Sequence, residues 1–270
     1  MKESLLCCSV CGQPLTFDEK NARCPKGHCF DRAARGGYVH LLRQHRRGSS
    51  DPGDSAAMCQ ARTRFLEGNW YGSLRDTVAK LAADCAPQDI LDAGCGEGWY
   101  TRAVLDTCPD ARLAGIDLSR YALRHAGRTC PRGDFAIASL FELPLADASV
   151  DLVLHLFAPM CAEEFARVLR SGGTLLTVTP GARHLWGMKE VLYQKPYENP
   201  TEIRELPGLN FEREVCVEDI ITLTDPQDIA ALYQMTPYAW KTPKEAADRL
   251  LHRDALTTPI SFQIHLYRKG

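Results

Sequence analysis

The sequence predicts an α/β protein in which a mostly parallel, seven-stranded sheet follows a small N-terminal metal-binding domain. Three observations support this prediction. From residue 72 onward, short apolar strands alternate with helical segments, the pattern of βαβ units. A glycine-rich turn follows the first of these strands, and five of the twelve cysteines lie within the first 35 residues. With 270 residues, 45% of them hydrophobic, the chain can bury a core of this size.

Charge is distributed unevenly along the chain. Residues 1–53 carry nine lysines and arginines against five acidic residues, a net charge of +4. The whole chain has a formal charge of −2, so the remainder carries −6. Such asymmetry is typical of a protein in which one domain meets nucleic acid.

The N-terminus lacks the apolar stretch of a signal peptide, and no apolar run approaches the roughly 18 residues that a membrane helix needs. We therefore expect a cytoplasmic protein with no membrane partner. Disulfides are rare in that reducing compartment, so clustered cysteines indicate a metal site or buried thiols.

Residues 1–35 are interpreted as a small zinc-binding module. Its candidate ligands are Cys8, Cys11, Cys24 and His28. Two residues separate the first pair, three separate the second, and twelve lie between the pairs. Two such pairs complete a tetrahedron, and three thiolates with one imidazole are a common set for structural zinc. Cys29 is an alternative fourth ligand, and buried thiols without metal would leave so short a segment with little core.

Residues 36–71 are interpreted as a basic linker followed by a helix. The segment Ser49–Gly53 is rich in turn-forming residues. Asp54 and Ser55 are suited to cap a helix, and apolar residues follow them at helical spacing. The basic run Arg43, Arg46 and Arg47 is expected to bind nucleic acid, and the alternative is a solvated charged face.

Residues 72–270 are expected to form one α/β domain. The candidate strands are residues 90–92, 113–117, 135–138, 151–154 and 174–178. Helices are expected near 98–107, 119–129 and 161–170, and again near 226–234 and 243–251. The apolar segment 211–223 and a closing strand over 260–267 predict an antiparallel addition to the sheet.

The loop after the first strand of this domain carries three alternating glycines, Gly94, Gly96 and Gly98. Glycine permits the turn and lets the backbone approach a ligand closely. A dinucleotide fingerprint would need glycine at position 99, where this chain has Trp99. The acidic residues Asp92 and Asp117 end the first two strands and suit a cofactor with ribose hydroxyls and an amino acid moiety. The alternative is a purely structural turn, with Asp117 capping the helix that starts at Ser119.

These motifs resemble class I, Rossmann-like S-adenosylmethionine-dependent methyltransferases over residues 85–180, including the helix and glycine turn Ala166–Gly173. Together with the zinc set, the whole chain resembles the 23S ribosomal RNA (guanine-N1) methyltransferases of the ribosomal large subunit methyltransferase A family. That resemblance is carried in addition by the segments Gly37–Leu42, Asp51–Ser55 and Thr179–Leu185.

The resemblance implies a specific activity and specific site residues. The expected activity is methyl transfer from S-adenosylmethionine to N1 of a guanosine in a 23S rRNA hairpin loop, with the N-terminal module taking part in RNA recognition. The implied zinc ligands are Cys8, Cys11, Cys24 and His28. The implied cofactor contacts are Tyr71, the pair Gly96 and Glu97, and His184. Which guanosine is methylated stays open, and so does the oligomeric state, with a homodimer among the alternatives.

Guanine N1 lies on the Watson–Crick edge, so the target must be unpaired or turned out of the stack. Its proton must leave, and the candidates for a general base, by position only, are His155, Glu163 and Glu164. The segment Phe157–Pro159 replaces the Asp/Asn-Pro-Pro-Tyr motif of amino-group methyltransferases, which makes exocyclic adenine nitrogen a poorer target. A base-stacking platform is expected among Trp70, Trp99, Tyr100 and Phe157.

Two other functions compete with this interpretation. One is a small-molecule methyltransferase whose zinc module docks a partner. The other is a noncatalytic RNA-binding protein of ribosome assembly with a relic cofactor pocket. The positive charge of residues 1–53 disfavours the first, and the intact glycine loop with Asp117 disfavours the second.

Overall fold

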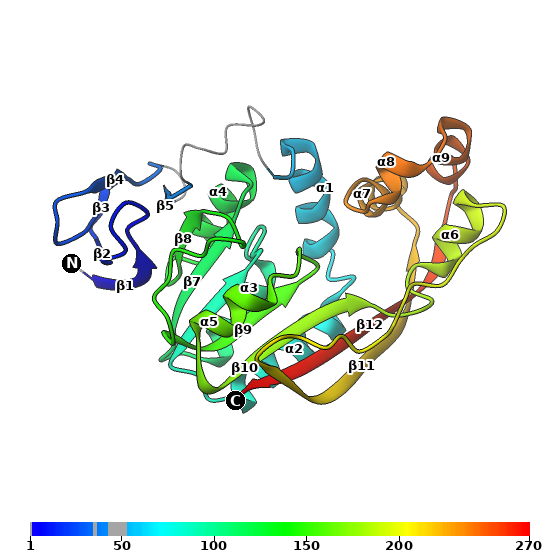
Figure 1. The fold of residues 1–270 in the computed structure, drawn as a ribbon. Helices are drawn as coiled ribbons and strands as arrows, with labels where there is room; N and C mark the ends of the chain where they lie inside the picture. The colour runs from blue at the N-terminus through cyan, green and yellow to red at the C-terminus, as the bar shows by residue number, and fades with distance from the viewer. Residues whose placement is uncertain (1, 35–36, 43–52) are drawn as a thin grey trace.

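The computed structural model describes residues 2–34, 37–42 and 53–270. Figure 1 shows a small N-terminal sheet at one end of the molecule, a large central sheet, and a helical group at the other end. The small sheet is antiparallel, with the strands in chain order. Its strands are β1 (Lys2–Cys7), β2 (Pro14–Phe17), β3 (Asn21–Arg23) and β4 (Cys29–Asp31).

The large sheet has eight strands in the order β11-β12-β10-β9-β6-β7-β8-β5. All neighbours from β10 to β5 are parallel, whereas β12 pairs antiparallel with both β10 and β11. The predicted antiparallel addition is therefore confirmed. The strands are β5 (Tyr38–His40), β6 (Asp89–Ala93), β7 (Arg112–Asp117), β8 (Asp134–Ile137), β9 (Val150–Leu156), β10 (Leu169–Pro180), β11 (Leu209–Leu223) and β12 (Leu256–Lys269).

The sheet has one strand more than the seven expected. The additional strand is β5, which pairs in parallel with β8 through Tyr38 opposite Phe135. A three-residue strand is too short to show a periodic pattern, so it could not be recognised from its residues. The segment interpreted as a linker thus contributes an edge strand to the methyltransferase-like sheet.

The helices connect and cover the strands, as Figure 1 shows. Ser55 caps α1, since its side chain accepts a hydrogen bond from the backbone N–H of Met58, which confirms the predicted cap. No helix among the described residues is long and apolar enough to span a membrane. The helices are α1 (Ala56–Glu67), α2 (Gly72–Asp84), α3 (Trp99–Thr107), α4 (Arg120–Thr129), α5 (Ala162–Val168), α6 (Trp186–Leu192), α7 (Pro226–Gln234), α8 (Tyr238–Lys241) and α9 (Lys244–Leu251).

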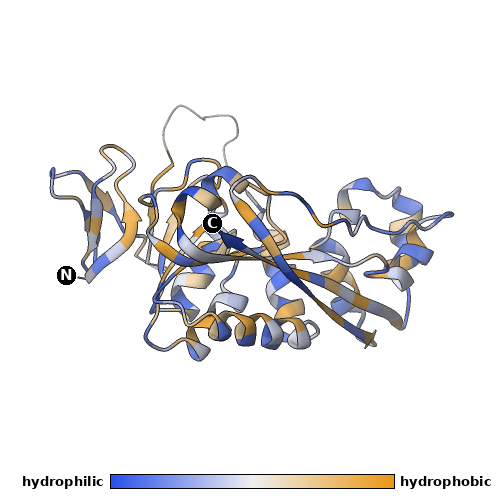
Figure 2. Cartoon of the chain, turned by 60° about the horizontal axis from the view of Figure 1, so that its bottom comes forward, coloured by the Kyte–Doolittle hydropathy of each residue, from blue (hydrophilic) through white to orange (hydrophobic). Residues whose placement is uncertain are grey.

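The N-terminal sheet and the large sheet share one hydrophobic cluster. Leu6 is fully buried and bridges Leu145, while the backbone N–H of Cys7 donates to the carbonyl of Pro144 at 2.7 Å. The same cluster contains Leu91 and Val153 from the central strands. Figure 2 shows how hydrophobic residues alternate with hydrophilic ones along the long strands, as a sheet with a buried face requires. The module is therefore packed against the large domain.

Candidate functional site

The glycine loop follows β6 and leads into α3. Gly94, Gly96 and Gly98 have φ angles of +85°, +53° and +78°, in the left-handed region that favours glycine. A Cβ atom at Gly94 would lie 2.6 Å from the Cβ of Ala158, which real side chains do not tolerate. The loop therefore needs glycine both for its conformation and for the close approach of the segment after β9.

A pocket of about 350 Å³ lies beside this loop, at the carboxyl ends of β6, β7, β8 and β9. Parallel sheets bind ligands at such an edge, where the strand order reverses. The pocket lining also includes residues 138–141 after β8 and residues 156–159 at the end of β9. Five of the predicted cofactor residues line it, namely Asp92, Gly94, Gly96, Glu97 and Asp117.

Two carboxylates line the pocket, one buried (Asp92) and one partly buried (Asp117). Asp92 accepts a hydrogen bond of 2.6 Å from the Thr101 hydroxyl, and burial raises the pKa of Asp92 to about 7. Asp117 accepts hydrogen bonds from the backbone N–H groups of Gly96 and Ser119, at 3.0 and 2.7 Å. Asp117 therefore fixes the glycine loop and also accepts a hydrogen bond at the start of α4. It thus has both positions that the sequence allowed, beside the cofactor loop and at the start of this helix.

Glu97 is engaged in a buried ion pair. Arg62 on α1 donates to both carboxylate oxygens of Glu97, at 2.7 and 2.9 Å, and to Asp54 at 2.6 Å. Since the Glu97 carboxylate is paired in this way, the groups that its loop presents to a ligand are those of the backbone. The sequence analysis missed Arg62, because an arginine on an amphipathic helix resembles any solvated residue. The available signal is its place on the predicted helix, seven residues or about two turns after the Ser55 cap.

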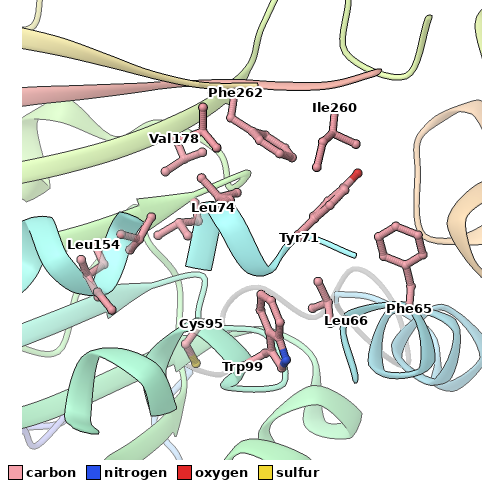
Figure 3. Packing of buried hydrophobic residues seen from close by; sticks show 14 of the residues in the cluster. Phe65, Leu66, Tyr71, Leu74, Cys95, Trp99, Leu154, Val178, Ile260 and Phe262 are labelled. Carbon is pink, nitrogen blue, oxygen red and sulfur yellow. The ribbon is translucent and has the colours of Figure 1, made fainter. Parts of the chain in front are cut away.

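Tyr71 and His184 lie together behind the pocket. The Tyr71 hydroxyl is 3.2 Å from Nε2 of His184, and neither residue is among those that line the pocket. The backbone N–H of Ser261 donates to Nδ1 of His184, so the proton of the neutral ring is on Nε2. Burial, together with the charge of Lys189, lowers the pKa of His184 to about 3. Figure 3 shows the Tyr71 ring close to Phe262 and Ile260, within the apolar core. The implied cofactor contacts at these two positions stay predictions.

Gly98 is the remaining predicted cofactor residue. It precedes α3 as its N-cap, with the left-handed conformation given above. A Cβ atom here would lie 3.0 Å from the Cβ of Ala126 on α4. Gly98 therefore serves the packing of the loop against α4, and it does not line the pocket.

The four predicted zinc ligands converge at one end of the N-terminal module. The ligand atoms of Cys8, Cys11, Cys24 and His28 all lie within 4.8 Å of one another. Ligands about 2.3 Å from a tetrahedral zinc would lie about 3.8 Å apart, so this set fits the ion. The thiol of Cys29 is exposed and contacts the Asn21 side chain, outside the cluster. The geometry favours His28 over Cys29 as the fourth ligand.

The three candidates for a general base differ in their surroundings. Glu164 is paired with Arg167 at 2.7 Å and accepts the backbone N–H of Leu143, and both contacts lower its pKa. Glu163 is an exposed residue in the first turn of α5. His155 is buried at the end of β9, where its Nδ1 atom is 3.1 Å from the Thr177 hydroxyl. Glu164 is therefore structural, and His155 is the candidate that lies in the sheet.

The predicted aromatic platform is reduced to one exposed ring. Trp99 is buried and packs edge-on against Tyr100 at a centroid distance of 4.9 Å. Trp70 is partly buried and packs against the same core cluster. Phe157 is 47% exposed and lines the pocket. Trp99 and Tyr100 also line the pocket, and Phe157 is the exposed residue of the four. Arg43, Arg46 and Arg47 lie outside the described residues.

Comparison with known proteins decides the family. A family model described as "Methyltransferase domain" matches residues 90–173, and one described as "RlmA, N-terminal" matches residues 6–50. The 23S rRNA (guanine(748)-N(1))-methyltransferase of Streptomyces fradiae is 34% identical over 90% of this chain and 89% of its own. A Micromonospora griseorubida protein named for the same class of reaction is 35% identical over 94% of this chain and 92% of its own. This chain belongs to the 23S rRNA (guanine-N1) methyltransferase family.

In this methyltransferase, the residues of the pocket fit S-adenosylmethionine. The Tyr100 hydroxyl lines the pocket and is buried with no hydrogen-bond partner within the described part of the chain, so a polar ligand would satisfy it. Asp117 and the glycine loop line the pocket, and the Asp117 carboxylate would be an acceptor for hydroxyl groups of the cofactor. When bound, the cofactor supplies an activated methyl group on a sulfonium. In the same way, the cluster of Cys8, Cys11, Cys24 and His28 would hold the structural zinc of the ribbon.

Proposed function

We propose that this protein transfers a methyl group from S-adenosylmethionine to N1 of a guanosine in a hairpin loop of 23S rRNA. The observation that carries this proposal is the similarity over at least 90% of the chain to a relative named for this reaction, which includes both the zinc ribbon and the methyltransferase domain. Similarity to a relative in the glycine loop alone would support the identity of the cofactor but would not identify the substrate.

The proposed division of labour follows the chain. Residues 1–35 form the zinc ribbon, which contacts RNA. Residues 36–71 carry the basic run, β5 and α1, and residues 72–270 form the methyltransferase domain. A rigid zinc ribbon packed on the sheet supports this assignment, since it would hold an RNA hairpin at a fixed place relative to the pocket.

Each proposed cofactor residue has a role that its environment supports. Gly94 and Gly96 give the cofactor access to the backbone, and Glu97 lines the pocket beside them. Asp117 accepts hydrogen bonds from the ribose, while Asp92 keeps the loop and α3 together through Thr101. Tyr71 and His184 contact Phe262, whose ring is 4.8 Å and 4.6 Å from theirs, and Phe262 in turn lies 5.8 Å from the ring of Phe157, which lines the pocket.

The proposal is tested by incubating the protein with labelled S-adenosylmethionine and 23S rRNA that lacks this modification. The labelled nucleoside is then identified and located by mass spectrometry. The expected product is 1-methylguanosine at one loop position, and a transcript in which that loop is closed by base pairing is the control and should not be labelled. Light scattering on the same sample with and without RNA measures whether the protein is a homodimer.

Two results would overturn the proposal. Cofactor binding without transfer to RNA would favour a ribosome-assembly protein. Transfer to a small molecule in a cell extract, with no label in RNA, would favour a small-molecule methyltransferase.

A further inference from the structure

A second cavity of about 410 Å³ opens next to the cofactor pocket. It is formed by the ends of β9 and β10, by β12, and by the segment that joins α6 to β11. Phe157 and Ala158 line both cavities, so the two cavities meet at these residues. A volume of this size is that of a pocket for a small organic group.

A row of polar side chains crosses the sheet beneath this cavity. His155 on β9 lies opposite Thr177 on β10, Thr177 lies opposite His265 on β12, and His265 lies opposite Glu214 on β11. Paired residues on neighbouring strands point to the same face. His155, Thr177 and His265 are all buried, and Nε2 of His265 is 2.7 Å from a Glu214 carboxylate oxygen. A buried polar row costs stability unless its members find partners, which indicates a use for it.

His155 is the member of the row whose polar atoms are not all satisfied. His155 is 3% exposed. Its Nδ1 atom is hydrogen-bonded to the Thr177 hydroxyl, and its Nε2 atom has no hydrogen-bond partner within the described part of the chain. The ring lines the second cavity. Burial lowers the pKa of His155, so the imidazole is neutral near pH 7.

Phe157 adds a second, independent observation. Its φ angle is 56°, a left-handed conformation that is unfavourable for a residue with a side chain. Backbone strain of this kind persists where the surroundings impose it, and it is concentrated at functional sites. Phe157 is 47% exposed at the place where the two cavities meet.

The outer wall of the cavity is fixed and carries both signs of charge. Asn199 accepts a hydrogen bond from Lys189 and donates one to the carbonyl of Gly181, both at 2.8 Å. At the other end the Tyr267 hydroxyl donates to the carbonyl of Arg204 at 3.0 Å. Between these anchors, Glu202 offers an acceptor and Arg204 offers donors at the cavity.

We propose that this second cavity receives the target guanine, with its ring on Phe157 and its N1 edge at Nε2 of His155. On either side of N1, guanine presents the N2 amino donor and the acceptor O6, which Glu202 and Arg204 complement. Adenine has no amino group at C2 and has a donor in place of O6, so it would meet both side chains unfavourably. This inference rests on the proposed function.

The methyl transfer in this arrangement is balanced as follows. The N1–C bond forms while the bond between the methyl carbon and sulfur breaks, and S-adenosylhomocysteine leaves as a neutral thioether. The proton on N1 passes to Nε2 of His155 and from there to solvent. A positioned general base of this kind contributes about 10²-fold or more to the rate.

The test uses two substitutions, each of which keeps a polar group at the position of one ring nitrogen of His155. His155→Asn keeps a polar group near the Nδ1 position, toward Thr177, and removes Nε2, whereas His155→Gln reaches the Nε2 position. The full-length protein is used with unmodified 23S rRNA and S-adenosylmethionine. A carboxamide accepts no proton near neutral pH, so we expect the single-turnover rates of His155→Asn and His155→Gln both to fall about 100-fold, with cofactor affinity by calorimetry unchanged.

Phe157→Ala should raise the RNA concentration for half-maximal rate by about tenfold, because base stacking on a ring contributes about 1–3 kcal/mol. Phe157→Tyr, which keeps the ring, should restore it. His252→Ala, an exposed histidine at the end of α9, is the control and should methylate like the wild type.

The inference is wrong if wild type methylates guanine N1 and His155→Asn and Phe157→Ala do so at the same rate and affinity. Loss of cofactor binding in His155→Asn would also overturn it, since that would indicate a structural role in the cofactor pocket. If the wild-type protein itself labels no guanine, the proposed function fails instead, so the two failures are distinguishable.

Discussion

The ion pair between Arg62 and Glu97 connects α1 to the glycine loop, and its removal allows a quantitative test. The Glu97 side chain is 3% exposed and that of Arg62 is 24% exposed. Arg62→Ala would leave a buried carboxylate without its partner, and breaking a buried pair in this way costs about 3–5 kcal/mol. Because Arg62 retains some contact with water, we expect a loss near the lower end, about 3 kcal/mol of unfolding free energy.

A double-mutant cycle separates the pair from the side chains. In the Arg62→Ala background, Glu97→Gln removes the uncompensated charge and should recover part of the loss, with a coupling energy of at least about 1 kcal/mol. Arg64→Ala is the matched control. It lies on the same helix and pairs with Asp225 and Asp228, but in an exposed position, so its loss should stay below about 1 kcal/mol.

The assay is urea unfolding followed by tryptophan fluorescence, with calorimetric titration of S-adenosylmethionine on the same variants. Cofactor affinity should fall in Arg62→Ala, because the loop that carries Glu97 lines the pocket. Equal losses for Arg62→Ala and Arg64→Ala, or a Glu97→Gln change that adds to the first loss, would refute the reasoning.

Three further predictions concern the other site residues. Cys24→Ser, or removal of zinc by a chelator, should lower the melting temperature of the whole protein, measured by calorimetry, because the ribbon shares a hydrophobic cluster with the sheet. An unchanged melting temperature would mean that the ribbon unfolds separately. Asp117→Asn should weaken S-adenosylmethionine binding about tenfold in a titration, since a hydrogen bond to a charged acceptor contributes about 1.5–3 kcal/mol; full affinity would exclude the ribose contact. Asp92 has a folded pKa of about 7, above the value of about 4 in the unfolded chain, so its stability contribution is present below pH 4 and is lost as pH rises through 7. Asp92→Asn should flatten this decline in unfolding experiments between pH 4 and pH 8, and an unaltered slope would contradict the assignment.

The parts of the fold that were predicted are those with strong local signals. The strand before Asp92, the alternating glycines and the helix after them are encoded by neighbouring residues, and the structure confirms them. The same holds for the cysteine spacing, because a tetrahedral set of ligands must come from closely spaced pairs.

The parts that were not predicted depend on contacts between distant segments. The strand β5 exists because β8 offers it a free edge, and three residues show no period of their own. The contact between Tyr71 and His184 joins residues 113 positions apart, so only the family resemblance pointed to either one. The cavity wall formed by residues 199–204 could not be predicted for the same reason. These residues border a cavity only once β9, β10 and β12 lie side by side in the folded sheet.

The attachment of the zinc ribbon to the sheet has a consequence for target choice. The ribbon is joined to the larger domain by the bridge between Leu6 and Leu145 and by the hydrogen bond from Cys7 to Pro144, in addition to the chain connection. The distance between the ribbon and the pocket is thus fixed by the folded protein, whereas a flexible linker would let it vary. An RNA that contacts both places must therefore span this fixed distance. A change in the packing at Leu145 would then shift which nucleotide of a loop reaches the pocket, without any change in the residues that contact the base.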